Sequence, residues 1–208
     1  KNIRNNIIAN VYINYNITKD LLFTVRGSAN NTYQIVQSFN GSNTQSGSPI
    51  GSNQVNGSVV NYRNEWYDNT NLLTYNKNFG RQHHLNVVIG TEVQKNQTQA
   101  WGYSSKQIPV EGMGLGGIAT GTINIPPTGT LSSNTAVSGI GSLSYNFGER
   151  YYLTGNFRAD GSSKFIGDNR WGYFPSGAFK WKFTNEKFIP KNDILTDGNI
   201  RVSYGVTG

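Results

Sequence analysis

The 208-residue sequence predicts an all-β, antiparallel fold, and three observations support this prediction. Glycine occurs 25 times, aromatic residues make up 12% of the chain and charged residues only 14%, a mixture typical of many strands joined by polar turns. Apolar and polar residues alternate between the turns, as they do in strands whose successive side chains point to opposite faces. No run approaches 18 consecutive apolar residues, so no transmembrane helix is expected.

The clearest alternation lies in residues 151–183, on both sides of a polar loop. In the first strand the apolar positions are Tyr151, Leu153, Gly155, Phe157 and Ala159, and the polar positions are Tyr152, Thr154, Asn156, Arg158 and Asp160. In the second strand Phe179, Trp181 and Phe183 alternate with Lys180, Lys182 and Thr184. Each strand is therefore expected to present one apolar face and one wet face.

Six further strands repeat this alternation and bring the expected total to eight. They are residues 7–17, 21–36, 59–79, 84–103, 137–147 and 199–207. Short turns are expected at residues 18–20, 78–81 and 148–150, and long polar loops at residues 37–58 and 106–135. A medium loop (residues 161–171) and a connection with one helical turn (residues 185–198) complete the order.

The alternation of short turns with long loops is typical of outer-membrane β-barrels, which have short turns on one rim and long loops on the other. A mean hydropathy of −0.49 agrees with such a barrel, because only every second residue of its wall faces lipid. Eight strands could close a small barrel. Two loops of this length instead favour a piece of a larger barrel, and both ends of the chain read as interior sequence.

Charge and motifs argue against several other classes of protein. The 18 Lys and Arg residues give a net charge of +7 but are scattered singly, so no nucleic-acid partner is expected. The absence of cysteine excludes a disulfide scaffold, and the adjacent His83 and His84 point apart on a strand, so no metal site is expected. Residues 112–117 fit G-x-G-x-x-G but lack the flanking strand and helix of a dinucleotide site. We therefore expect no cofactor and no enzymatic activity.

Four residues are candidates for contact with a solute. Arg158 and Asp160 lie one pleat apart on a polar face, where they either pair with each other structurally or line a substrate path. Trp66 and Trp101 lie near strand ends, where they either sit at a membrane interface or stack on sugar rings. In both cases the sequence favours the structural role and leaves the binding role open.

The amino-acid sequence of residues 158–175 resembles that of a known protein family. The run RADGSSKFIGDNRWGYFP, followed by Trp181 and by residues 184–188 (TNEKF), resembles the C-terminal barrel of the SusC/RagA family of TonB-dependent outer-membrane transporters. Ile166, inserted between Phe165 and Gly167, departs from that family's pattern. Residues 201–208 (RVSYGVTG) also resemble a sequence motif of the family, and the resemblance is strongest over residues 137–208.

The resemblance implies that the chain is about a third of a 22-stranded, plugged barrel in the outer membrane. It also implies an active importer of oligosaccharides or peptides, a SusD-like lipoprotein covering the long-loop side, and energy supplied through TonB by a plug domain outside this chain. Rival interpretations are a passive porin or adhesin barrel, a soluble carbohydrate-binding β-sandwich using Trp66 and Trp101, and a small enzyme barrel with a converging acid pair.

Overall fold

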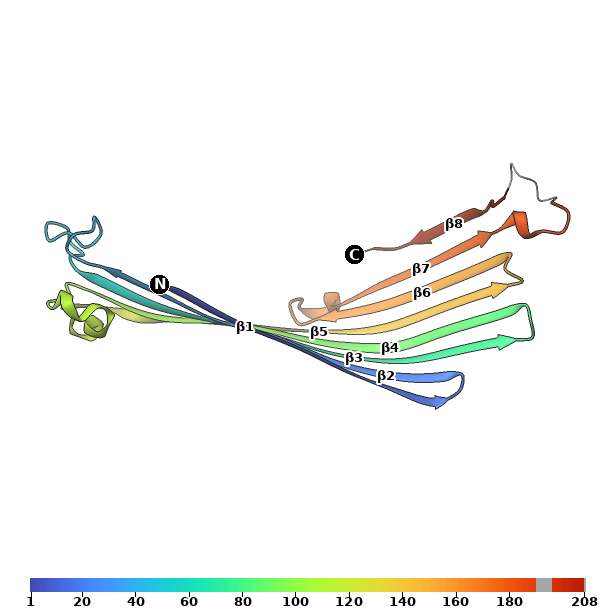
Figure 1. The fold of residues 1–208 in the computed structure, drawn as a ribbon, viewed down its shortest axis with the longest axis horizontal. Helices are drawn as coiled ribbons and strands as arrows, with labels where there is room; N and C mark the ends of the chain where they lie inside the picture. Colours follow the sequence, from blue (N-terminus) through green and yellow to red (C-terminus); the bar gives the residue numbers. More distant parts are fainter. Residues whose placement is uncertain (190–195, 208) are drawn as a thin grey trace. The chain divides into compact units, whose positions relative to one another are not determined.

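The computed structural model describes residues 1–189 and 196–207, and within them the chain forms a single eight-stranded sheet. The strands are β1 (Asn2–Thr18), β2 (Leu21–Asn40), β3 (Asn56–Phe79), β4 (His83–Lys106), β5 (Ile123–Phe147), β6 (Tyr151–Ser162), β7 (Trp171–Trp181) and β8 (Ile200–Gly205). Each strand pairs with its neighbours in sequence, in the order β1 to β8 (Figure 1). The predicted all-β fold with eight strands is confirmed. No helix among the described residues has the length and apolarity needed to cross a bilayer.

The chain divides into two compact units. Unit 1 contains Lys1–Ala9, Ala29–Tyr67 and Lys95–Ser133, and unit 2 contains Asn10–Ser28, Asp68–Gln94 and Asn134–Gly208. The two long loops belong to unit 1. All three short turns, together with β6, β7 and β8, belong to unit 2.

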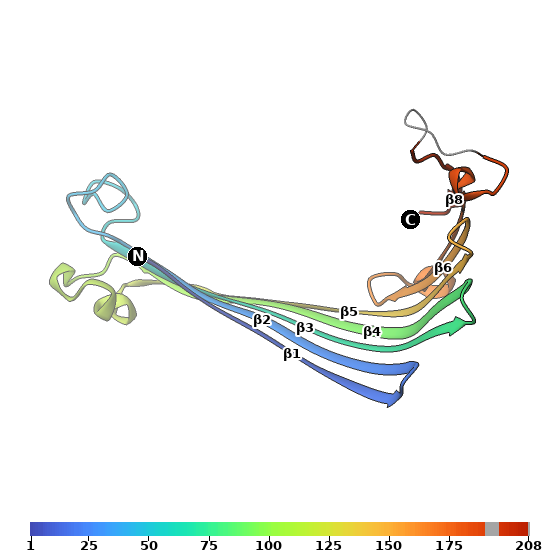
Figure 2. The ribbon, with the colours of Figure 1, turned by 45° about the vertical axis from the view of Figure 1, so that its right-hand side comes forward.

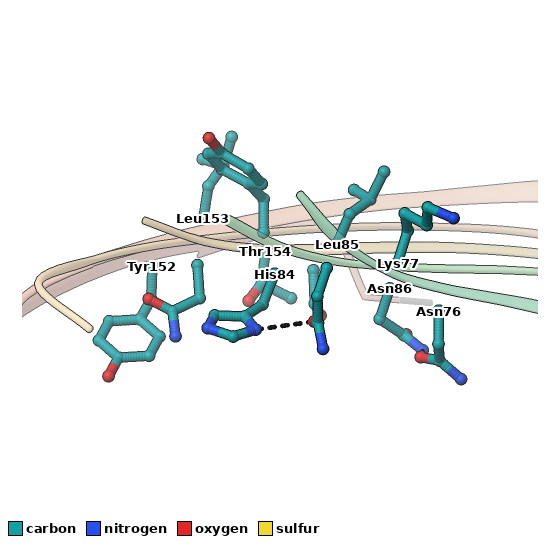
Figure 3. Close-up of a pocket in the computed structure, with 12 residues that line it drawn as sticks. Asn76, Lys77, His84, Leu85, Asn86, Tyr152, Leu153 and Thr154 are labelled. Atoms are coloured by element: carbon teal, nitrogen blue, oxygen red, sulfur yellow. Dashed lines mark hydrogen bonds between the residues drawn. The ribbon is translucent and has the colours of Figure 1, made fainter. Parts of the chain in front are cut away.

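The strand registers of unit 2 confirm the predicted sorting of side chains. The pairing is antiparallel, with Leu153 opposite Tyr145 and Phe179, and its sequence neighbours Tyr152 and Thr154 are on the other face. Figure 3 shows Leu85 and Leu153 on one side of the sheet and His84 and Tyr152 on the other. We call these the apolar face and the polar face of unit 2. The apolar face includes Leu143, Leu153, Phe157, Phe179 and Val202, all of them exposed.

The two long loops of unit 1 pack against each other. Residues 41–55 lie beside the 3₁₀ segment η1 (Glu111–Thr120), as Figure 2 shows. The Ser42 amide donates to Glu111 Oε1 at 3.0 Å, and the Ile108 amide donates to the Val55 carbonyl at 2.9 Å. Ile108 is 3% exposed. These two loops, residues 41–55 and 107–122, therefore form a packed surface that we call the loop platform.

The strands are longer and the loops shorter than the sequence predicts. β5 begins at Ile123, so Pro126 and Pro127 lie inside a strand rather than in the expected loop. β6 pairs with β5 only from Ala136 onward, which leaves the preceding residues with a sheet edge on that side, where one of the two prolines loses no ladder hydrogen bond. β3 also begins earlier than predicted, at Asn56, so the first long loop is limited to residues 41–55.

The expected second strand of the 151–183 segment is also shifted. β7 starts at Trp171, the last residue of the predicted loop (residues 161–171), and ends at Trp181. Phe183 starts the 3₁₀ segment η3 (Phe183–Asn185), so Phe183 and Thr184 leave the strand. Of the 185–198 connection, in which one helical turn was predicted, residues 190–195 lie outside the described residues.

Candidate functional site

The polar face of unit 2 carries a charged cluster centred on Arg158 of β6. Its Nε donates to both carboxylate oxygens of Asp160, at 2.7 and 2.9 Å. Its Nη2 donates to Glu92 Oε2 and to Ser138 Oγ, both at 3.0 Å. Glu92 comes from β4 and Ser138 from β5, so three neighbouring strands meet at one guanidinium. We call these four residues the Arg158 cluster.

The charges of the Arg158 cluster are balanced to within one unit. One guanidinium faces two carboxylates, and the second oxygen of Glu92 accepts a hydrogen bond from Gln94 at 2.7 Å. The Arg158 side chain is 44% exposed and that of Glu92 is 18% exposed, so solvent screens part of the attraction. Because the planar guanidinium offers donors in a fixed fork, it holds both carboxylates at once, which a lysine cannot do in the same geometry.

A cavity of about 610 Å³ opens beside the Arg158 cluster. Its lining includes Arg158, Asp160, Phe165, Arg170, Trp171 and Phe174. Arg170 adds a second cation, and the aromatic residues add apolar surface. A cavity of this composition can take a solute that has both polar groups and a flat apolar face.

Sequence reasoning placed Arg158 and Asp160 correctly beside each other but missed their other two partners. The pairing of Asp160 with Ser138 follows from the β5–β6 register, and that of Arg158 with Glu92 requires contact across two strands. Neither register is encoded locally. The sequence feature that could have pointed to Glu92 as a partner of Arg158 is its position on the polar side of a predicted strand.

The structure does not bring Trp66 and Trp101 together as one site. A Cβ atom added at Gly102 of β4 would touch the Val60 side chain of β3, so these two positions lie on the same face of the sheet. Because side chains alternate along a strand, the even-numbered residues of β3 and β4 share that face. Trp66 therefore points to one side of the sheet and Trp101 to the other. Trp66 is half-buried and Trp101 is exposed, and each can contact a different neighbour.

The histidine pair also separates. His83 Nδ1 lies 2.6 Å from the Tyr145 hydroxyl, whereas His84 Nδ1 lies 2.7 Å from Asn78 Oδ1. Tyr145 pairs with Leu153 of the apolar face, and His84 is on the polar face (Figure 3). Among the described residues no three His, Asp or Glu side chains gather as metal ligands would.

A second charged centre, at Glu186, ties together the short-turn end of unit 2. Its carboxylate accepts hydrogen bonds from the Tyr151 hydroxyl at 2.6 Å, Arg150 Nη1 at 2.8 Å and Trp181 Nε1 at 3.1 Å. Glu186 is 7% exposed. The hydrogen bond from Tyr151 foremost, with those from Trp181 and Arg150, holds the pKa of the Glu186 carboxyl below its ordinary value, against the opposing effect of burial. Glu186 thus joins the β5–β6 turn to the end of β7.

We expect the contribution of Glu186 to be lost in acid. Its pKa is lower in the folded protein than in the unfolded chain, so the carboxylate stabilises the fold fully above the unfolded value and loses this effect as pH falls through the folded value. In full-length protein, wild type should therefore be more stable than E186Q at pH 7, and the difference should shrink below pH 4.5. Chemical unfolding of both proteins at several pH values measures this difference. A gap that is independent of pH would contradict the role given to the charge.

The architecture and the comparisons together define the class of protein. The first five connections of the sheet alternate between short turns and long loops, and unit 2 has one apolar and one polar face, a combination typical of the wall of a transmembrane β-barrel. No protein-family model matches the chain. Among curated proteins, TonB-dependent receptor P3 of Formosa agariphila is 33% identical over 138 residues, which cover 66% of this chain and 14% of the relative. TonB-dependent receptor SusC of Bacteroides thetaiotaomicron is 44% identical over 81 residues, or 39% of this chain and 8% of SusC.

The similarity extends along the whole chain. TonB-dependent receptor P26 of Formosa agariphila is 27% identical over 99% of this chain, which spans 21% of that relative. A solved structure of the RagAB peptide transporter has the same fold, with a TM-score of 0.88, 22% identity and coverage of 98% of this chain and 22% of that one. The chain belongs to the SusC/RagA family of TonB-dependent receptors and is a segment of its β-barrel.

Proposed function

We propose that the chain is part of the barrel wall of an active importer in the outer membrane, one that takes up oligosaccharides or peptides. The support is the combination of the two-faced sheet of unit 2 with the likeness to SusC and to TonB-dependent receptors P3 and P26. Lipid would cover the apolar face, because a closed barrel satisfies every backbone polar group and leaves only side chains to meet hydrocarbon. The polar face and the Arg158 cluster would line the solute path.

The proposal includes two partners that act on the full-length protein. TonB would supply energy through a plug domain outside these 208 residues. A SusD-like lipoprotein would cover the loop platform, where Ile50, Val110 and Met113 expose apolar side chains. A packed loop pair favours this contact, because a preformed surface loses little conformational entropy when a partner binds.

The test uses the full-length gene in its own host. Wild-type cells should take up a labelled oligosaccharide or peptide pool, and deletion of the gene or of TonB should abolish uptake. Uptake that continues without TonB would instead favour the passive porin. Failure of the wild-type strain to take up either pool would overturn the import function.

The same cells test the partner. Purification of the tagged transporter should recover a surface lipoprotein in near-equal amount. The paired charge changes I50D and M113D should lower that recovery, because they place charges in the apolar surface of the loop platform. K95Q, which changes an exposed residue outside the platform, is the matched control. Unchanged recovery in the double variant would contradict the docking site.

A further inference from the structure

Polar side chains on the polar face of unit 2 mostly hydrogen-bond to one another across the strands. The pairs are Thr24 with Asn14 at 2.8 Å, His84 with Asn78 at 2.7 Å, Ser142 with Asn156 at 2.8 Å and Asn156 with Ser176 at 3.3 Å. The Arg158 cluster satisfies its own charges in the same way. Most polar side chains of this face therefore already have a hydrogen-bond partner within the protein when a solute passes.

Two cations on this face lie next to each other. Lys180 of β7 and Arg201 of β8 stand directly opposite each other in the antiparallel register. Within the described part of the chain, neither forms an ion pair with a carboxylate, although Lys182, two residues along, pairs with Asp197 at 3.1 Å. Like charges placed directly opposite each other destabilise a sheet. Their juxtaposition therefore calls for an anion.

Lys180 is flanked on both sides within unit 2. Its Nζ lies 3.8 Å from the centroid of the Tyr152 ring on β6, and Arg201 faces it from β8. Among the described residues of β6 and β8, no carboxylate pairs with Lys180. The ring holds the ammonium in place by a cation–π contact without neutralising it.

A hollow of about 170 Å³ lies at this point, lined by Tyr152, Thr154, Ala178, Lys180 and Arg201. Its volume accommodates one small charged group. The guanidinium of Arg201 offers paired donors that match the two oxygens of a carboxylate, the ammonium of Lys180 adds a second charge, and the Thr154 hydroxyl adds a neutral polar group.

We propose that Lys180 and Arg201 form a carboxylate-binding site on the polar face, with Tyr152 positioning the lysine. The carboxylate belongs either to an acidic solute or to another segment of the full-length protein that reaches this face. The first source rests on the proposed import function and restricts it to solutes that bear a carboxylate. The second does not depend on import.

The experiment measures acetylation of Lys180 in purified full-length protein, quantified by mass spectrometry with Lys95 as the internal standard. Lys95 is exposed and forms no ion pair among the described residues. The first pair of ligands is digalacturonate and its neutral methyl ester. The second is N-acetyl-trialanine and its neutral amide. We expect one of the acids, and neither neutral form, to slow labelling of Lys180 by about fivefold or more, because a bound carboxylate covers the amine. R201Q should abolish this protection.

The remaining outcomes distinguish a carboxylate of an acidic solute from a carboxylate of the protein itself, and both of these from the absence of a binding site. Resistance of Lys180 to labelling in ligand-free wild type, relieved in R201Q, would assign the carboxylate to another segment of the protein. Labelling of Lys180 at the Lys95 rate under every condition would overturn the site. The assay needs neither TonB nor transport, so the import function can fail in the uptake test while the site stands, and the reverse also holds.

Discussion

Replacing Phe157 with lysine is expected to destabilise the folded barrel by about 2–4 kcal/mol, the cost of a lysine on the lipid face near the bilayer midplane. Phe157 lies in the middle of the 12-residue strand β6, and about 10 residues suffice to cross the hydrocarbon, so it falls near the centre of the span. Its side chain is 48% exposed on the apolar face and stacks on Tyr173 with ring centroids 6.2 Å apart. The measurement is the unfolding free energy of full-length protein in lipid vesicles.

The matched control is the neighbouring residue on the other face. Asn156 points to the polar face, where it hydrogen-bonds to Ser142 and Ser176. N156K should cost roughly 1 kcal/mol, because it removes neutral hydrogen bonds at a wet surface and places no charge in lipid. Equal destabilisation by F157K and N156K would show that the two faces are wrongly assigned.

Replacing Arg158 with methionine is expected to cost about 2 kcal/mol. Breaking a buried ion pair by removing one partner costs about 3–5 kcal/mol, and we reduce this figure because Arg158 is 44% exposed and therefore screened by water. The loss arises because the carboxylates of Glu92 and Asp160 remain without their shared counter-charge. Denaturant unfolding of the full-length protein measures it.

A double-mutant comparison shows whether the contacts carry this effect. In an E92Q/D160N background, R158M should cost less than about 0.5 kcal/mol, because no carboxylate is left unpaired. R158K should recover only part of the wild-type stability, since a lysine cannot hold Asp160 and Glu92 with the same fork. An R158M effect that is equally large in both backgrounds would mean that packing, rather than charge pairing, holds the cluster.

Local pattern was sufficient to predict much of the fold. A period of two residues depends only on strand geometry, so the faces of β6 and the pairing of Arg158 with Asp160 were predicted from adjacent residues alone. The same is true of the turns, because glycine and asparagine mark sharp reversals. At Gly80 and Gly148 the backbone has positive φ angles of 64° and 59°, which glycine adopts without strain.

What the sequence did not reveal depends on neighbours in space. Glu92 meets Arg158 only because β4, β5 and β6 align in one register, and no local feature states that register. Glu186 was present in the quoted TNEKF segment, but its three donors come from two other parts of the chain. The opposite orientations of Trp66 and Trp101 likewise follow from how β3 and β4 pair.

The two prolines of β5 have a consequence for assembly of the barrel. Because β6 pairs with β5 only from Ala136 onward, the earlier part of β5 has a free edge on that side, with exposed side chains. Such an edge invites pairing with a strand of another molecule while the protein is still outside the membrane. The N–H groups of successive residues point to opposite sides of a strand, so one of Pro126 and Pro127 removes a hydrogen-bond donor from this edge and makes it a poorer template for aggregation. The proline that faces this edge thus lowers the tendency of the projecting part of β5 to pair with another chain before the barrel is assembled.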